Sequence, residues 1–141
     1  MRLDYRTSLP AGLKGMLALE QAVHDSSLEP RLLELVKMRA SQINGCAHCL
    51  DMHSKDARAL GEDEQRLHLL AAWREAPVYS DRERAALAWC ETLTRVAETG
   101  APDADFAPLQ IDVVHIDTLG WNAVQRLLAN PKALDQVRVA R

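Results

Sequence analysis

Residues 34–53 of the 141-residue chain read ELVKMRASQINGCAHCLDMH, and this stretch carries the strongest signals for both fold and chemistry. Its apolar residues recur with helical spacing as far as Asn44-Gly45, a dipeptide typical of turns. A second helix is expected to begin at Cys46 and to stop at Gly61, because glycine is favoured just past the ends of helices. The stretch therefore predicts two consecutive helices joined by a short turn.

The rest of the chain is also helical in character. Aromatic residues make up 4% of the sequence, and good helix formers dominate it. A helix-start pattern is visible in Ser80-Asp81-Arg82-Glu83, which forms a capping box. Periodicity and breakers predict helices over about 13–24, after Ser27 to 44, 46–61, 63–75, 80–100 and 111–130, with a loop over 101–108. We therefore expect an all-α fold of about six helices in a single compact domain over residues 1–141, with the segment after 100 fitting the pattern least well.

Composition limits the classes of function. The 17 Lys and Arg residues against 20 Asp and Glu give a net charge of −3, which lacks the basic footprint of a nucleic-acid binder. Residues 1–10 carry charges and no apolar secretory core, and apolar runs such as Leu69–Trp73 are too short to cross a bilayer. We therefore expect no nucleic-acid partner, no membrane partner and a cytoplasmic location. In that reducing compartment, a close cysteine pair is more often catalytic or metal-binding than structural.

Three side chains of the second helix fall on one face. Cys46 at the helix start, Cys49 one turn on and His53 one further turn on are spaced by three and four residues. A free thiol has a pKa of roughly 8.5, and a helix N-terminus or a Cys-X-X-Cys motif lowers it. His53 can accept a proton from Cys49 or orient it. Such a pair can condense to a disulfide after peroxide oxidation of one sulfur, or exchange with the dithiol of a partner.

Glu34 belongs to the same interpretation. It lies twelve residues before Cys46, on the preceding helix. A turn at Asn44-Gly45 that reverses the chain would bring Glu34 near the cysteine pair. A partly buried glutamate beside His53 would make a proton relay.

Other interpretations of these residues remain open. A zinc site would use Cys46, Cys49 and His53, with His48, His24 or Glu34 as the fourth ligand, but a second ligand pair at a recognisable spacing is missing. A thioredoxin-like motif needs a strand before the cysteines, and none is indicated. Elsewhere, Cys90 is expected to be a buried thiol. Three tryptophans are expected to fill core or subunit contacts: Trp73, Trp89 and Trp121. Four charged residues are expected to form the exposed outer face of the cysteine helix: Asp51, Lys55, Asp56 and Arg58.

The same residues resemble a known family. The run Glu34…Arg39-Ala-Ser41…Asn44-Gly-Cys46-Ala-His48-Cys49…His53 is similar to the alkylhydroperoxidase D-like branch of the carboxymuconolactone decarboxylase superfamily. The likeness continues through Ser54–Gly61, Trp73–Pro77 and Ser80–Thr99, and covers roughly residues 10–100. After Gly100 the chain departs from the family pattern, with Ile116-Asp-Thr-Leu-Gly-Trp121-Asn122 in place of an Ile-Asn-x-Trp-Asn-like stretch.

The resemblance implies a role for each residue of the motif. Cys49 would be the peroxidatic thiol and Cys46 would resolve its sulfenic acid, whereas the helix-end argument favours Cys46 as the sulfur of lower pKa. Glu34 and His53 would relay protons, with His48 helping. The family also implies an all-helical fold, a homo-oligomer (trimer or hexamer), and chemistry without a cofactor or metal.

Function follows as an expectation. The sequence predicts a thiol-dependent peroxidase, an antioxidant enzyme that reduces hydroperoxides and is regenerated by a thiol reductant such as a lipoyl or thioredoxin-like protein. One alternative is a thiol–disulfide oxidoreductase or redox-sensing module that acts on a partner protein. Another is a carboxymuconolactone decarboxylase-like enzyme, whose chemistry does not require two adjacent thiols.

Overall fold

A computed structural model describes residues 5–26 and 28–106, and the regular elements in these ranges are all helices. In chain order they are α1 (Tyr5–Ser8), α2 (Pro10–His24), α3 (Pro30–Asn44), α4 (Ala47–Ala59), α5 (Glu64–Leu69), the 3₁₀ turn η1 (Leu70–Ala72), α6 (Asp81–Thr94), α7 (Val96–Thr99) and α8 (Asp103–Phe106). The expected all-α class is confirmed. The helix expected over 111–130, with His115 and Trp121, lies outside the described residues.

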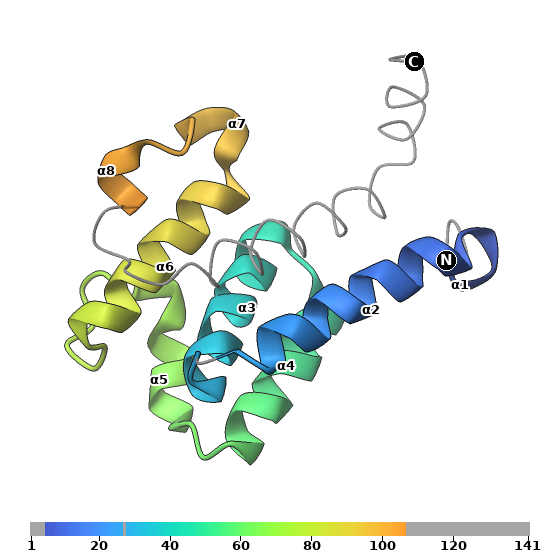
Figure 1. Cartoon of the computed structure of the whole chain (residues 1–141). Coiled ribbons are helices and arrows are strands. Elements are labelled where there is room, and N and C mark those ends of the chain that lie inside the picture. Colours follow the sequence, from blue (N-terminus) through green and yellow to red (C-terminus); the bar gives the residue numbers. More distant parts are fainter. Residues whose placement is uncertain (1–4, 27, 107–141) are drawn as a thin grey trace.

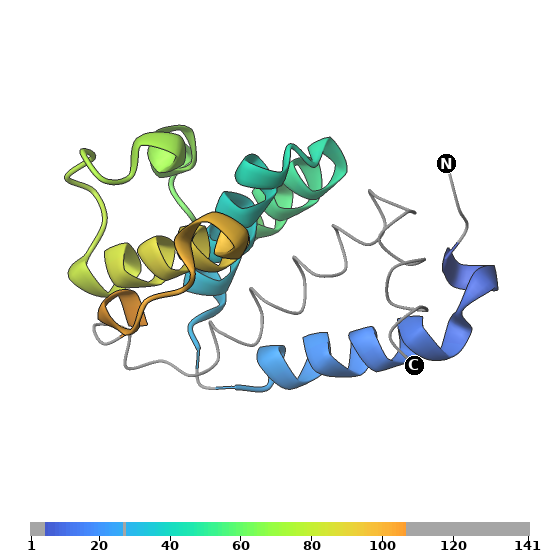
Figure 2. The same cartoon turned by 90° about the horizontal axis from the view of Figure 1, so that it is seen from above.

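Helix α3 is the centre of the fold. It packs against α4 on one side and against α6 on the other, as Figure 1 shows. Every residue from 32 to 38 is buried, so this part of α3 is enclosed on all sides rather than along a single stripe. The turned view in Figure 2 shows that α2 approaches the other helices at its C-terminal end and diverges from them toward its N-terminal end.

The ends of α3 and α4 follow from local chemistry. Pro30 is the first residue of α3, where its fixed φ suits the helix and its missing N–H costs nothing. Gly45 ends α3 with φ +65°, a left-handed conformation that glycine adopts without strain. Cys46 then has extended backbone and caps α4, its sulfur accepting the Cys49 N–H at 3.3 Å. The predicted turn is thus present, with Cys46 as the cap rather than the first helical residue.

The expectation of a single helix over 63–75 is wrong. Helix α5 begins after Asp63, whose carboxylate accepts the Gln65 N–H at 2.7 Å, but it ends at Leu69 and passes into η1. The guanidinium of Arg84 donates hydrogen bonds to the carbonyl oxygens of Trp73 and Arg74 at 3.1 and 2.9 Å. A guanidinium from a distant helix therefore satisfies carbonyl groups that a continuing helix would have used.

The expectation of one helix over 80–100 is also wrong, although its start is confirmed. Ser80 and Glu83 form the predicted capping box, but α6 ends at Thr94 and α7 starts anew at Val96. The Thr99 hydroxyl donates to the Thr92 carbonyl at 2.7 Å, and the Thr94 hydroxyl donates to the Cys90 carbonyl at 2.6 Å. Hydroxyl groups that bond to main-chain carbonyls in this way compete with the helical ladder. The segment expected as a loop over 101–108 contains the single turn α8.

Two apolar clusters share α3. The first lies among α2, α3 and α6, and consists of Val23, Leu28, Leu32, Leu33, Val36, Ala40, Ala86, Trp89, Cys90 and Leu93. The second lies among α3, α4, α5 and α6, and consists of Leu35, Met38, Ala57, Leu67, Leu70, Trp73, Ala76, Tyr79 and Leu87. The expected burial of Cys90, Trp73 and Trp89 is confirmed. Removing apolar surface from water on two faces of one helix makes α3 the main contributor to the core.

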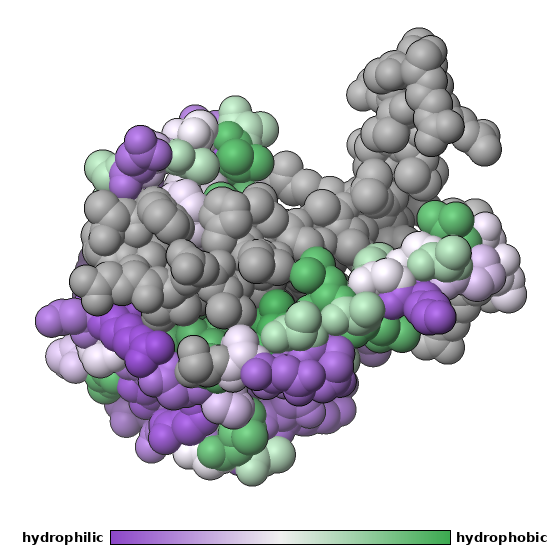
Figure 3. Space-filling model, in the orientation of Figure 1, coloured by the Kyte–Doolittle hydropathy of each residue, from purple (hydrophilic) through white to green (hydrophobic). Residues whose placement is uncertain are grey.

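Some apolar surface remains exposed at α2. Leu9 is 62% exposed, and Leu17 and Leu19 are also exposed. Figure 3 shows apolar surface along this helix beside hydrophilic surface. The homo-oligomer implied by the sequence resemblance stays a prediction.

A buried carboxylate joins the central helices. Glu91 of α6 accepts hydrogen bonds from Arg39 of α3 at 2.7 Å and from the Trp73 ring N–H at 2.8 Å, and it also pairs with Arg74. Burial alone would raise the pKa of Glu91, but the bonds from Trp73, Arg74 and Arg39 outweigh it and lower the pKa below its ordinary value. The ionised carboxylate therefore stabilises the packing of α3 on α6.

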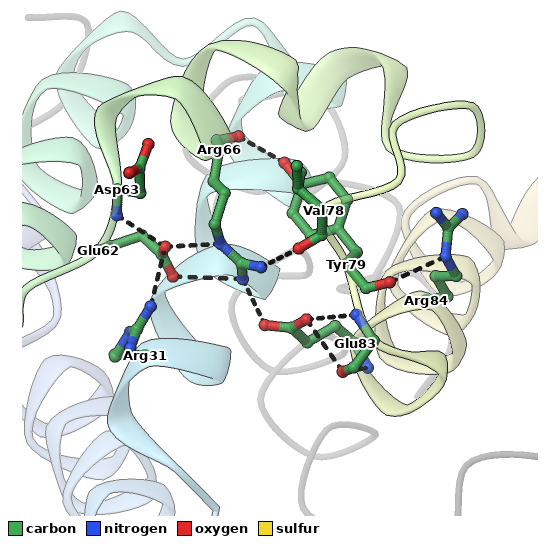
Figure 4. A network of polar contacts seen from close by, with 9 residues as sticks. Arg31, Glu62, Asp63, Arg66, Val78, Tyr79, Glu83 and Arg84 are labelled. Atoms are coloured by element: carbon green, nitrogen blue, oxygen red, sulfur yellow. Dashed lines mark hydrogen bonds and ion pairs between the residues drawn. The ribbon is translucent and has the colours of Figure 1, made fainter.

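A second polar network holds the α4–α5 connection, as Figure 4 shows. Glu62 accepts from Arg31 at 3.1 Å, from Arg66 at 2.7 Å and from the Asp63 N–H at 2.8 Å, and Arg66 also pairs with Glu83. Burial raises the pKa of Glu62, whereas Arg31, the Asp63 N–H and Arg66 lower it further than burial raises it. Glu62 thus ties the end of α4 to α3 and α5.

Replacing Glu91 by Gln is expected to lower the free energy of unfolding by about 3 kcal/mol, because Arg39 would be left partly buried without its counter-charge. Urea denaturation monitored by circular dichroism measures this change. The matched control is Glu29→Gln, which removes an exposed pair with Arg82 and should change stability little. Equal effects of the two substitutions would contradict the role given to Glu91.

Stability should also fall in acid. Glu62 and Glu91 have pKa values in the folded state that are lowered from 4.5. At a pH between the folded-state and unfolded-state pKa of each group, the unfolded chain therefore binds more protons than the folded chain. Their contribution is complete above pH 4.5 and is lost as the pH falls through the folded-state pKa. Urea midpoints measured from pH 7 to pH 3 should decline below 4.5, with a shallower decline in Glu91→Gln.

Candidate active site

The two neighbouring cysteines are joined. Cys46 and Cys49 form a disulfide with 5.4 Å between their Cα atoms. This Cα separation falls within the usual range for a disulfide. Cys46 is half-buried at the N-cap of α4, whereas Cys49 on the first turn is only 5% exposed. The pair thus has one sulfur nearer to solvent and one enclosed by the protein.

The turn before the pair is fixed by main-chain bonds. The Gly45 N–H donates to the Gln42 carbonyl at 3.3 Å, and the Cys46 N–H donates to the Ser41 carbonyl at 3.1 Å. The fully buried Ser41 donates its hydroxyl to the Lys37 carbonyl at 2.7 Å. These bonds satisfy the last carbonyl groups of α3 and set the direction in which α4 leaves.

Glu34 and His53 meet in the interior. His53 Nδ1 lies 2.8 Å from Glu34 Oε2, and both side chains are about 95% buried. An ionised carboxylate can only accept, so Nδ1 carries the hydrogen and Nε2 of the neutral ring is left with a lone pair. Within residues 5–26 and 28–106, His53 Nε2 is buried and has no hydrogen-bond partner. The pair therefore presents a proton-accepting nitrogen held in one orientation by Glu34, two turns into the cysteine helix.

The structure does not bring His48 to this pair. His48 is exposed on the first turn of α4, and no hydrogen bond joins it to Glu34 or His53 in the described part of the chain. His24 lies on α2 and pairs with Glu20 instead. The helping role expected for His48 stays a prediction.

The ligand set expected for a zinc site is also not assembled. The sulfurs of Cys46 and Cys49 are bonded to each other, so neither is available as a thiolate ligand. In the described ranges, the metal-ligating side chains that do converge are Glu34, His53 and Asp56, whose donor atoms lie within 4.8 Å of one another.

Asp56 was missed as a member of this site by the sequence analysis. It is exposed, as expected for the outer face of its helix, but its carboxylate reaches the buried pair. The signal lies in the spacing: Asp56 follows His53 by three residues and Cys49 by seven, so all three share one side of α4.

Comparison with known proteins places these features in a family. The family model for "Carboxymuconolactone decarboxylase family" matches residues 10–92, more than half of the chain. The chain belongs to this family. The match includes the whole of α3 and α4 and therefore the site described above.

Its relatives narrow the family to one branch. A crystal structure from Agrobacterium tumefaciens, of a protein of unknown function suggested to be the antioxidant defence protein AhpD, superposes with a TM-score of 0.82. The two sequences are 41% identical, with 91% of this chain and 92% of that chain covered. The family member described here thus lies in the AhpD-like branch, as its sequence motif indicated.

Two curated relatives are themselves uncharacterised. YdfG of Bacillus subtilis is 44% identical over 102 residues, which cover 72% of this chain and 69% of that protein. YnjA of Escherichia coli is 35% identical over 103 residues, which cover 73% of this chain and 54% of that protein. The chain therefore spans about half the length of the E. coli relative.

Among the described residues, no helix has both the length and the apolar character needed to span a bilayer.

The geometry predicts how many thiols react. Denatured, fully reduced protein should show three reactive thiols, and denatured, oxidised protein should show one, because only Cys90 lies outside the disulfide. Thiol titration and peptide mass spectrometry, with a loss of two mass units mapped to Cys46 and Cys49, check this. A disulfide that involved Cys90 would contradict the site.

Proposed function

We propose that this family member is a thiol-dependent peroxidase that reduces hydroperoxides through Cys46 and Cys49. The observation that carries the proposal is a disulfide at the N-terminus of α4, followed on the same helix by a histidine whose orientation a buried glutamate fixes. This arrangement supplies a nucleophile, a resolving thiol and a proton carrier within two turns of one helix. Its AhpD-like relative points to the same antioxidant chemistry.

The reaction balances in three steps. The Cys49 thiolate attacks the terminal oxygen of ROOH, the O–O bond breaks, and Cys49 becomes a sulfenic acid while the leaving alkoxide takes a proton to give ROH. The Cys46 thiol then attacks the sulfenic sulfur, which forms the disulfide and releases water. An external dithiol finally exchanges with this disulfide, restoring both thiols and becoming oxidised itself.

The difference in exposure between the sulfurs suits these roles. Cys46 is the more accessible sulfur, so a bulky thiol reductant would attack it and release Cys49 as the leaving thiolate. A helix N-terminus stabilises negative charge, which favours that departure. Placing the attack on peroxide at Cys49 follows the family resemblance, and it keeps the sulfenic acid in the enclosed position.

Glu34 and His53 act together in this proposal. Glu34 holds Nδ1 of the ring, so that Nε2 accepts a proton from a thiol and later returns it to the leaving oxygen. An imidazole suits this exchange because it gains and loses a proton near neutral pH.

Replacing Cys49 by Ser is expected to abolish hydroperoxide turnover with a dithiol reductant, because serine cannot supply the attacking thiolate. Cys46→Ser should keep one round of peroxide reduction and accumulate a sulfenic acid that a dimedone probe labels. Cys90→Ala is the matched control, since it removes the buried thiol outside the disulfide and should preserve turnover. Unchanged turnover in Cys49→Ser would defeat the assignment; labelling of Cys46 in that variant would reverse the two roles.

Replacing Glu34 by Gln should lower the rate of peroxide reduction by about 10²-fold and alter its pH profile, because the amide no longer fixes the imidazole. Stopped-flow measurement of the first turnover from pH 5 to pH 9 tests this. Glu29→Gln is the control for the same change at an exposed position. A pH profile in Glu34→Gln that matches the wild type would remove Glu34 from the relay.

One measurement separates the peroxidase from the alternatives. A thiol–disulfide oxidoreductase or redox sensor would form its disulfide far faster with a partner protein than with ROOH. Activity of the Cys46→Ser, Cys49→Ser double variant on a lactone would instead indicate decarboxylase-like chemistry.

A further inference from the structure

Three donor side chains converge beside the cysteine helix, and two of them, Glu34 and His53, are paired with each other. Glu34 on α3, and His53 and Asp56 on α4, place one donor atom each within 4.8 Å of the other two. Glu34 and His53 are buried, whereas Asp56 opens the group to solvent. The proposed peroxidase reaction uses Glu34 and His53 but leaves Asp56 without a task.

The charge balance of this group differs from that of the other buried acids. Glu62 and Glu91 are each matched by arginines. Lys37, one turn after Glu34 on α3, is paired with Glu20 of α2 instead. In the part of the chain that the structure describes, neither Glu34 nor Asp56 has an ion pair with Lys or Arg. Two carboxylates therefore share one imidazole, and in these ranges no Lys or Arg side chain is paired with either of them.

The distances suit a bound metal ion. Ligand atoms about 2.1 Å from a shared metal are separated by roughly 3 to 4 Å. Glu34 Oε2 and His53 Nδ1 are already 2.8 Å apart, and the third donor belongs to an exposed side chain that can move toward them. A metal would therefore need the loss of the proton between His53 and Glu34, a shift of the Glu34 carboxylate out of line with Nδ1, and a movement of Asp56 toward them.

We propose that Glu34, His53 and Asp56 form a binding site for one divalent transition-metal ion of the Zn²⁺ or Co²⁺ type. One imidazole and two carboxylates are the nitrogen and oxygen donors that such ions accept, whereas Ca²⁺ and Mg²⁺ prefer oxygen donors alone. Three protein ligands leave a coordination position open to water. The site shares Glu34 and His53 with the cysteine-based zinc set, but it uses Asp56 and needs neither sulfur.

Occupancy of this site has a consequence that rests on the proposed peroxidase function. The metal would take the place of the proton shared by His53 Nδ1 and Glu34, and so would fix the charge of the relay. Metal binding and proton transfer then compete for the same atoms. The ion is accordingly an inhibitor of peroxide reduction rather than a cofactor for it.

The decisive experiment uses oxidised protein, in which the Cys46–Cys49 disulfide removes both thiolates as ligands. Titration with Co²⁺, followed by its visible absorption, and calorimetric titration with Zn²⁺ should each give one ion per chain, without a thiolate charge-transfer band. Asp56→Asn should weaken binding by about tenfold or more, in line with the sensitivity of metal sites to their immediate surroundings. Asp51→Asn is the matched control, because Asp51 is an exposed acid on the same helix that pairs with Lys55.

Several results would overturn the site. They are non-saturable binding, unchanged affinity in Asp56→Asn, or equal losses in Asp56→Asn and Asp51→Asn, which would indicate general attraction to an acidic surface. Turnover assays form a separate arm, in which Zn²⁺ should inhibit Asp56→Asn at least tenfold less strongly than it inhibits Asp51→Asn. Equal inhibition of the two variants would overturn the competition with the relay. Absence of any peroxidase turnover would overturn the proposed function, while the binding titrations would still decide the metal site.

Discussion

The burial of α3 is the constraint on which the rest of the structure depends. This helix is enclosed by its neighbours, yet it carries Glu34, Lys37 and Arg39 among its apolar residues. A charge taken out of water without a partner is costly, so each of these side chains requires a counter-group from another helix. Glu34 contacts His53 of α4, Lys37 contacts Glu20 of α2, and Arg39 contacts Glu91 of α6. The three polar contacts thereby specify which helix lies on which side of α3.

One of these three contacts joins a carboxylate to an imidazole, whereas the other two join a carboxylate to an ammonium or a guanidinium group. The guanidinium of Arg39 remains protonated, and Glu91 is held ionised by several donors that lower its pKa. The imidazole of His53 differs, because one of its ring nitrogens can donate a hydrogen bond while the other accepts one. The same physical requirement that fixes the architecture thus also places His53, the proposed proton carrier, on the helix that follows the cysteine pair's N-cap. The contact between Glu34 and His53 therefore serves both the packing of α3 on α4 and the proposed chemistry.

Local signals in the sequence were sufficient for the centre of the site. Asn44-Gly45 predicts a turn, and the helical spacing of Cys46, Cys49 and His53 predicts one shared face. These features depend on neighbours in the chain, and α3, α4 and their connection confirm them. The same turn led us to expect Glu34 near the cysteine pair, and the structure places it against His53 on the following helix.

Long-range contacts account for what the sequence analysis missed. The irregular segment after η1 is held by Arg84, which lies on a different helix and donates hydrogen bonds to the carbonyl groups of Trp73 and Arg74. The break after Thr94 is accompanied by the Thr99 hydroxyl, which donates back to the carbonyl of Thr92, seven residues earlier. Asp56 was assigned to the outer face, and it does lie there, but its approach to Glu34 depends on the packing of two helices. Periodicity predicts which face of a helix a residue occupies, but it does not predict which side chains at the border of that face contact a neighbouring helix.

The disulfide favours a catalytic role over a conformational switch. The Cα atoms of Cys46 and Cys49 are 5.4 Å apart, a separation that residues at i and i+3 adopt at the start of a helix in any case. Closing or opening the bond therefore requires rotation of side chains rather than a rearrangement of α4 against α3. A redox sensor needs its two oxidation states to differ in shape, because a partner must distinguish them. An enzyme benefits from the opposite property, since a thiol pair that cycles within a rigid frame keeps its distance to the proton carrier in every turnover.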